Sequence, residues 1–259
     1  MTGLLDGKTA LIVGVANKRS IAWAIAEQLS AAGARCAFTF QSERLEADVR
    51  KLAATLPNPG PILPLDVQDD AQLDAAVDGA AAGLGGLDIL VHAVAYARAE
   101  DLSGRFVDTD KEGFELALDI SAYSLSALAR RAEPHMTARG GGSIMALSYI
   151  AAERAVPGYN VMGVAKSTLE SIMRYLAWDL GESAIRVNAI SAGPVRTLAA
   201  RSIPGFMDMA DKAAARSPLR RSITAQEVAG AALFLASPLS SGVTGHVLYV
   251  DAGYHAIGL

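Results

Sequence analysis

The chain of 259 residues is 51% hydrophobic and carries a formal net charge of −4. This size and composition suit a single α/β domain spanning residues 1–259, and the acidic balance argues against nucleic acid as the main partner. No stretch approaches the roughly 18 uninterrupted apolar residues of a membrane span, and the opening MTGLLDGK has no basic segment before an apolar one, so we expect neither a membrane anchor nor a secretory signal.

The only cysteine of the chain, Cys36, lies in the apolar run RCAFTF. A single cysteine excludes an internal disulfide and favours a cytoplasmic location, and the apolar neighbours indicate a small core residue. The four scattered histidines complete no metal-ligand spacing with this cysteine, so we expect no metal site.

Short apolar runs alternate with longer amphipathic stretches along nearly the whole chain. Seven of these runs are typical of strands: residues 9–15, 35–40, 61–67, 87–94, 142–149, 185–191 and 246–251. They are apolar at successive positions, as strands of a parallel sheet are, because both faces of such a sheet are buried. The alternation predicts right-handed βαβ units in a Rossmann-like, doubly wound sheet of seven parallel strands, with the ligand at the carboxyl ends of the strands.

The stretch VGVANKRSIAW, residues 13–23, follows the first predicted strand, where a dinucleotide-binding protein carries its phosphate-binding turn. A G-x-G-x-x-G loop would hold three glycines, yet here Gly14 is followed by no other glycine before Ser20. A helix that opens at Ser20 still offers unpaired N–H groups to a pyrophosphate, and the Ser20 hydroxyl can cap that helix or donate to a phosphate oxygen. An ordinary capped turn that binds nothing would have the same pattern.

The second predicted strand leads to Gln41, where a dinucleotide site often has an acidic residue that holds the adenosine ribose. A glutamine can bond the ribose 2′-hydroxyl, whereas a 2′-phosphate favours a cluster of arginine or lysine. Arg44 is near, but no basic cluster accompanies it. The pattern therefore favours NADH over NADPH.

The strongest chemical pattern is the stretch LSYIAAERAVPGYNVMGVAK, residues 147–166. Tyr159 and Lys166 are seven residues apart in a stretch that we expect to be helical from about Pro157, so both side chains should lie on one face. A nearby lysine favours the phenolate form of a tyrosine and makes it a better acid–base group. Tyr149 ends the fifth predicted strand, at the rim where ligands bind. A pair on the helix surface with no catalytic role is the alternative.

This architecture and the tyrosine–lysine pair resemble the short-chain dehydrogenase/reductase superfamily. The common superfamily pattern is Tyr-x-x-x-Lys with a serine at the preceding strand end. Counted back from Lys166, that tyrosine position holds Met162 and the serine position holds Tyr149, while the tyrosine lies one helical turn earlier, at Tyr159.

The Tyr-x6-Lys spacing, with a second tyrosine ten residues earlier, resembles the bacterial enoyl-acyl carrier protein reductases. The turn of that family reads Gly-x5-Ser-Ile-Ala, which Gly14, Ser20, Ile21 and Ala22 match here. The stretch RVNAISAGPVRTLAA, residues 186–200, is similar as well. The likeness extends from about residue 8 to 253, so the missing glycines are read as a feature of this subfamily.

The resemblance implies an NADH-dependent oxidoreductase that reduces the trans-2 double bond of enoyl thioesters in fatty acid biosynthesis. Hydride goes to Cβ, and negative charge develops on the thioester oxygen farther along the substrate. The group that stabilises this oxygen should therefore lie farther from the nicotinamide, and a tyrosine moved by one turn, about 5.4 Å, is displaced in that direction. Tyr159 would stabilise the enolate oxygen. Lys166 would hold the nicotinamide ribose, and Tyr149 would line the site.

The resemblance also carries over a set of binding residues. Those implied for NADH are Gly14, Ser20, Ile21, Gln41, Asp66, Val67, Val94, Lys166, Val195, Thr197, Leu198 and Ala199. Those implied for the acyl substrate are Tyr96, Ala97, Met162, Ile203 and Phe206. Residues 197–216 would form a lid over the acyl chain, although an ordinary amphipathic helix would have the same sequence. Asp66 has an alternative role as the cap of the next helix.

The implied partner is acyl carrier protein, which brings the substrate, and Arg98, Arg220 and Arg221 are candidates for docking this acidic protein. The long helical stretches at about 111–137 and 158–180 imply a homotetramer, although packing inside one subunit would give the same pattern. Two other functions remain open: a carbonyl or hydroxysteroid-type reductase, and a non-catalytic nicotinamide-binding sensor. Met162 speaks against the first, and the Tyr159–Lys166 pair against the second.

Overall fold

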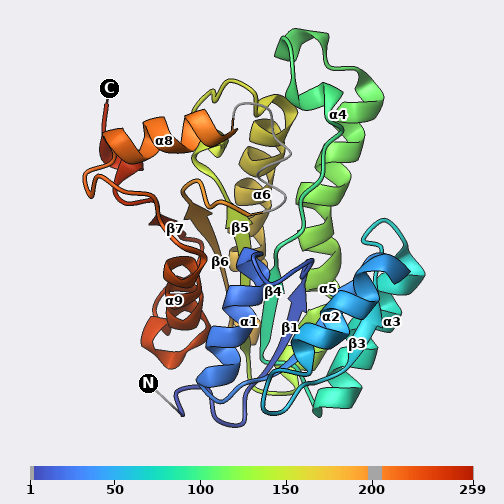
Figure 1. Ribbon diagram of the computed structural model, residues 1–259. Helices are drawn as coiled ribbons and strands as arrows, with labels where there is room; N and C mark the ends of the chain where they lie inside the picture. The colour runs from blue at the N-terminus through green and yellow to red at the C-terminus, as the bar shows by residue number, and fades with distance from the viewer. Residues whose placement is uncertain (1–2, 198–205, 259) are drawn as a thin grey trace.

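The computed structural model describes residues 3–197 and 206–258, without the side chains of Phe206 and Met207. Seven strands form one parallel sheet in the order β3-β2-β1-β4-β5-β6-β7 (Figure 1). The strands are β1 Thr9–Val13, β2 Arg35–Phe40, β3 Ile62–Pro64, β4 Ile89–His92, β5 Gly142–Ser148, β6 Ile185–Ala192 and β7 Val247–Val250. The predicted fold class is confirmed, and the order reverses between β1 and β4, where ligands bind in such sheets.

Helices cover both faces of the sheet (Figure 1). One face packs on α1 Ile21–Ala31, α2 Glu43–Ala53 and α9 Ala225–Ala236, and the other on α3 Asp70–Leu84, α5 Ser124–Thr137 and α6 Asn160–Asp179. The first core includes the tilted ring pair Trp23–Phe38, 6.0 Å between centroids, and Cys36, which is buried as predicted. No helix in the described ranges is long and apolar enough to cross a membrane.

Two further helices, α4 Lys111–Leu118 and α8 Phe206–Arg216, lie toward the carboxyl end of the sheet (Figure 1). The predicted helical stretch at about 111–137 is not one regular helix, because a π-helical turn, Asp119–Tyr123, separates α4 from α5. Such turns are frequent at functional sites, since they move side chains out of the regular helical order. Ser121 of this turn hydrogen-bonds to Tyr96 in the loop after β4, and Ser124, the first residue of α5, hydrogen-bonds to His92 at the end of β4.

Candidate active site

A cleft of about 680 Å³ opens along the carboxyl ends of the central strands. Residues that follow β1, β2, β3 and β4 form its walls, and Leu147 near the end of β5 closes one side. The volume falls in the range of small-molecule and cofactor sites. From the predicted site it brings together Gly14, Ser20, Ile21, Gln41, Asp66, Val67, Val94, Tyr96 and Thr197.

The turn between β1 and α1 explains how one glycine serves in place of three. Gly14 has φ +104°, and a Cβ there would lie 2.3 Å from the carbonyl oxygen of Ala93, so the strand ends approach too closely for a side chain. The backbone carbonyl of Asn17 accepts two hydrogen bonds from Ser20, one from its backbone N–H at 3.0 Å and one from its hydroxyl at 2.8 Å. A polar turn thereby replaces the remaining glycines.

Ser20 is the N-cap of α1, as predicted, and its hydroxyl oxygen accepts from the N–H of Trp23 at 3.2 Å. The first turn of α1 carries no acidic side chain, so its positive dipole end is not neutralised by the helix itself. A phosphate group suits this end of the cleft, because Ser20 offers a hydroxyl and the positive dipole end of α1 is not neutralised. The Ser20 hydroxyl hydrogen is engaged with Asn17, and it must rotate to reach a phosphate oxygen.

Gly14→Ala should lower the free energy of unfolding by about 2 kcal/mol or more, because it combines a left-handed backbone with a clash against a carbonyl. Gly7→Ala is the matched control, since Gly7 also has a positive φ, +72°, but nothing lies within 4 Å of the added Cβ. Urea unfolding of the two variants measures the difference. Equal losses would contradict the role of the close approach to Ala93.

The adenosine end of the cleft lies between the segments that follow β2 and β3. Gln41 is exposed there, and Asp66 accepts from the backbone N–H of Gln68 at 3.0 Å. The alternative role of Asp66 as a helix cap is wrong, because Asp69 caps α3 by accepting from the N–H groups of Ala71 and Gln72. Asp66 therefore stays available to a ligand in the cleft.

The loop after β4 is clamped by the π-helical turn. Ser121 accepts from the N–H of Tyr96 at 2.9 Å and donates to its carbonyl at 3.0 Å. Ser124 donates to the carbonyl of Ile120 at 2.6 Å, so Nε2 of the buried His92 donates to Ser124 at 2.7 Å. These contacts fix the backbone of the loop and leave the side chain of Tyr96 half exposed at the cleft.

The two tyrosines of the predicted site contact each other between the end of β5 and the start of α6, and neither is among the residues that form the walls of the cleft. The ring centroids of Tyr149 and Tyr159 are 4.9 Å apart, and the ring planes are inclined by 57°. Helix α6 begins at Asn160, not near Pro157, so Tyr159 is the residue before the helix and is oriented by the preceding turn. The Tyr149 hydroxyl lies 3.7 Å from the Met209 sulfur, which brings α8 to the same place.

Burial raises the pKa of Tyr159 above its usual value, and neighbouring Tyr149 adds to this. The pKa of Tyr149 is raised to about 12, again mainly by burial. This shift favours the neutral hydroxyl, which is opposite to the expected stabilisation of a Tyr159 phenolate by Lys166. Tyr159 keeps its hydroxyl proton at neutral pH, so it acts as a hydrogen-bond donor rather than as an anion.

Lys166 is buried in α6 and donates to the carbonyl of Leu147 at 2.8 Å. Burial lowers its pKa to about 8, and the carboxylate of Glu170 opposes this shift. Below that pH the amine is charged beside a residue that lines the cleft. The positive charge of Lys166 therefore lies next to the ligand site, held at the end of β5 that precedes Tyr149.

The structure leaves other predicted residues away from the walls of the cleft or outside the description. Val195 packs on the hydrophobic core and Met162 is buried in α6, while Ala97 and Lys166 are not among the wall residues. Leu198, Ala199, Ile203 and the side chain of Phe206 lie outside the described residues. The wall residues that the sequence reasoning missed include Asn17, Leu116, Ile120 and Leu147, of which Leu116 and Ile120 come from α4 and the π-helical turn.

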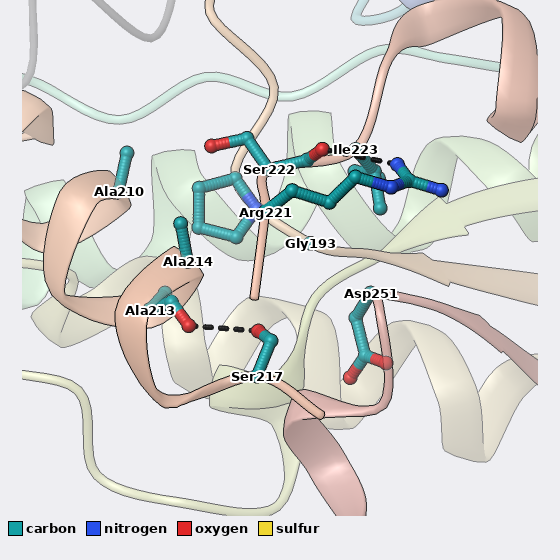
Figure 2. Close-up of a pocket in the computed structure, with 10 residues that line it drawn as sticks. Gly193, Ala210, Ala213, Ala214, Ser217, Arg221, Ser222, Ile223 and Asp251 are labelled. Atoms are coloured by element: carbon teal, nitrogen blue, oxygen red, sulfur yellow. Dashed lines mark hydrogen bonds between the residues drawn. The ribbon is translucent and has the colours of Figure 1, made fainter. Parts of the chain in front are cut away.

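A second hollow lies between α8 and the loop after β7 (Figure 2). Ser217 donates to the Ala213 carbonyl at 2.7 Å and Arg221 to the Ser222 carbonyl at 3.2 Å at its edge. Its volume of about 10 Å³ holds at most one water molecule, so it is not a ligand site. No cluster of potential metal ligands occurs in residues 3–197 and 206–258.

The family model described as enoyl-(acyl carrier protein) reductase matches residues 14–255. The chain belongs to the enoyl-acyl carrier protein reductase family. The enoyl-acyl carrier protein reductase (NADH) FabI of Nostoc sp. strain PCC 7120 is 51% identical over 258 residues, 98% of this chain and 99% of that protein. The enzyme of the same name from Bacillus cereus is 50% identical over 98% of this chain and 99% of that protein.

Solved enoyl-acyl carrier protein reductases have the same fold. The Bacillus cereus enzyme in complex with NADP+ and indole naphthyridinone aligns with a TM-score of 0.96 at 50% identity, covering 100% of both chains. The Anaplasma phagocytophilum enzyme in complex with NAD aligns with a TM-score of 0.95 at 47% identity, covering 100% of this chain and 98% of that one.

Proposed function

We propose that this protein reduces the trans-2 double bond of enoyl thioesters on acyl carrier protein, with NADH as the reductant, in fatty acid biosynthesis. The observation that carries the proposal is the ring contact between the partly buried Tyr149 and Tyr159, next to the strand end that also anchors Lys166. The membership of the chain in the enoyl-acyl carrier protein reductase family supports it. The single buried cysteine, Cys36, suits the cytoplasm as its compartment.

Tyr159 is the proposed acid of the site. The bound dinucleotide would supply a hydride to Cβ of the substrate. As negative charge develops on the thioester oxygen, the neutral Tyr159 hydroxyl donates a hydrogen bond to it, in a buried environment where such a bond stabilises most. Tyr149 shapes the apolar side of this position and orients the Tyr159 ring through their contact.

Lys166 is the proposed binder of the nicotinamide ribose. Its amine has three hydrogens, and the Leu147 carbonyl accepts one of them. The remaining hydrogens can reach ribose hydroxyls in the cleft that Leu147 lines. Its positive charge also favours the developing negative charge of the substrate.

A carbonyl reductase is disfavoured by the residue at the usual position of the acid. Met162 occupies that position, is buried in α6 and has no proton to donate. The acid instead lies one turn closer to the start of α6, at Tyr159. A non-catalytic sensor has no need of this tyrosine together with a buried lysine seven residues later.

The decisive test follows NADH absorbance with purified protein and a trans-2-enoyl thioester, and then with a 3-ketoacyl thioester. NADH oxidation with the enoyl substrate alone is the expected result. Oxidation only with the ketoacyl substrate would replace the proposal with a carbonyl reductase. NADH binding with no reaction on either substrate would favour the sensor.

The docking of the carrier protein and the homotetramer are further parts of the proposal. Arg98 is paired with Asp101 and Asp110, both at 2.7 Å, and Arg221 with Glu227, so these guanidinium groups are weaker docking candidates than their exposure suggests. Trp178 is 83% exposed on α6, an unusual position for an indole in a lone subunit. This exposed indole suits a subunit interface and so supports the proposed tetramer, whose mass light scattering would measure.

Gln41→Arg should raise kcat/KM for NADPH by about 10-fold, because a guanidinium can form charge-assisted hydrogen bonds with the 2′-phosphate. Gln41 is exposed at the adenosine end of the cleft, so the longer side chain has room. The value for NADH should change little. Steady-state rates with both dinucleotides check this, and an unchanged NADPH rate would place the 2′ position away from residue 41.

A further inference from the structure

A second buried polar pair lies one helical turn beyond Lys166. The side chain of Glu170 is 5% exposed, as is that of Lys166. The hydroxyl of Ser148 donates to a carboxylate oxygen of Glu170 at 2.5 Å. A buried carboxylate needs such partners, because its desolvation is costly. The proposed reaction gives Glu170 no role, so its burial here calls for a physical explanation.

Glu170 and Lys166 bind two successive residues of the same strand. They are four residues apart on α6 and therefore lie on one face of the helix. Lys166 donates to the Leu147 carbonyl at 2.8 Å, and Glu170 accepts from Ser148. The next residue is Tyr149, whose ring contacts Tyr159. Two turns of α6 thus fix the strand end that carries one of the site tyrosines.

We propose that Glu170 is a positioning residue for the reduction, which holds the end of β5 through Ser148 and keeps Lys166 charged through its own carboxylate. This inference rests on the proposed role of Lys166 in binding the cofactor. It assigns two separable tasks to one side chain. The hydrogen bond sets the geometry of Tyr149, and the negative charge sets the protonation of the lysine.

The charges around the pair support the second task. Glu170 raises the pKa of Lys166, against the effect of burial. From β4, the buried His92 faces Lys166, and its pKa is lowered to about 3, so it is neutral and supplies no competing charge at working pH. Glu170 is therefore the neighbour whose negative charge favours the charged lysine.

Besides Lys166, two charged side chains affect the pKa of Glu170, one of them on α6 itself. Glu153, just after the 3-10 turn that follows β5, raises the pKa of Glu170, while Arg174 on α6 lowers it. Tyr249 of β7 holds the Glu153 carboxylate by a hydrogen bond. Burial contributes most and raises the pKa of Glu170 above its usual value. Keeping the carboxylate ionised therefore costs free energy.

Two variants separate the tasks. Glu170→Gln keeps an oxygen that can accept from Ser148 but removes the charge, and Ser148→Ala removes the hydrogen bond but keeps the charge. Glu182→Gln, an exposed glutamate beyond the end of α6, is the control for loss of one negative charge. NADH affinity, measured by fluorescence, and kcat/KM are followed from pH 6 to 10, a range of our choosing that spans the Lys166 pKa of about 8.

Glu170→Gln should shift the alkaline limb of both profiles to lower pH by roughly half a unit to one unit, because an opposite charge is lost near Lys166. Ser148→Ala should leave this limb in place and lower kcat by about 3- to 10-fold, because a lost hydrogen bond of about 1 kcal/mol loosens Tyr149. A limb in Glu170→Gln that coincides with that of the wild type and of Glu182→Gln would overturn the inference.

The outcomes are distinguishable from failure of the proposed function. If the wild-type protein oxidises no NADH with an enoyl thioester, the reaction is wrong. The pH dependence of NADH binding still tests the charge coupling between Glu170 and Lys166 in that case. If the reaction proceeds and Glu170→Gln behaves as the wild type in both profiles, only the inference about Glu170 fails.

Discussion

Tyr159→Phe is expected to lower kcat with an enoyl thioester by about 10²- to 10³-fold, the effect of removing one donor to a developing oxyanion. NADH affinity should stay within about twofold, because the hydroxyl is assigned to the substrate oxygen and not to the cofactor. The ring still packs on Tyr149, so the fold should be unaffected. Stopped-flow measurement of NADH oxidation at saturating substrate reports the chemical step directly.

Tyr149→Phe is the matched comparison. Its hydroxyl contacts only the Met209 sulfur among the hydrogen-bond partners found in the described residues. A weak bond of this kind contributes little, so kcat should fall far less than in Tyr159→Phe. Equal losses in the two variants would mean that the two hydroxyls share the task, and full turnover in Tyr159→Phe would remove Tyr159 from the mechanism.

Lys166→Met should abolish most activity and yet stabilise the protein near neutral pH. Burial lowers the pKa of Lys166 from 10.5 to about 8. The folded state therefore disfavours the charged amine, at a cost of about 3 kcal/mol that is fully present below pH 8. A methionine of similar volume removes this cost and loses one hydrogen bond, so the net gain should be about 1–3 kcal/mol.

The free energy of unfolding of the wild type depends on pH through Lys166. Between the folded and unfolded pKa values, 8 and 10.5, the unfolded chain binds more protons, so the stability of the wild type rises with pH. The advantage of Lys166→Met should accordingly shrink over this range and disappear above it. Denaturant unfolding at pH 7 and at about pH 10.5 measures it. A variant that is less stable at both pH values would contradict the assigned cost of the buried charge.

The seven strands were predictable because each is an apolar run that cannot be exposed, and a run that is apolar on successive positions fits only a sheet covered on both faces. The observed parallel sheet confirms this. The first residues of the helices were harder to predict than the strands. Ser20 has the side chain of an N-cap and begins α1, whereas α6 begins at Asn160 because a turn orients Tyr159 before the helix.

The cleft was only partly predictable. Gly14, Gln41 and Asp66 follow strand ends, and parallel strands bring such residues to one edge of the sheet. Leu116 and Ile120 reach the same cleft from α4 and the π-helical turn. No local pattern marks that turn, because its hydrogen bonds depend on the loop after β4, more than 20 residues earlier in the chain.

The class of fold, the place of the dinucleotide turn and the Tyr-x6-Lys spacing follow from the sequence, since they depend on residue type and period alone. The pKa values of the site depend on the tertiary structure. Burial lowers the pKa of Lys166 and raises the pKa of Tyr159. Glu170 accepts its hydrogen bond from Ser148, which lies 22 residues earlier in the chain. Desolvation and charge–charge energies depend on three-dimensional distance, which residue spacing does not contain.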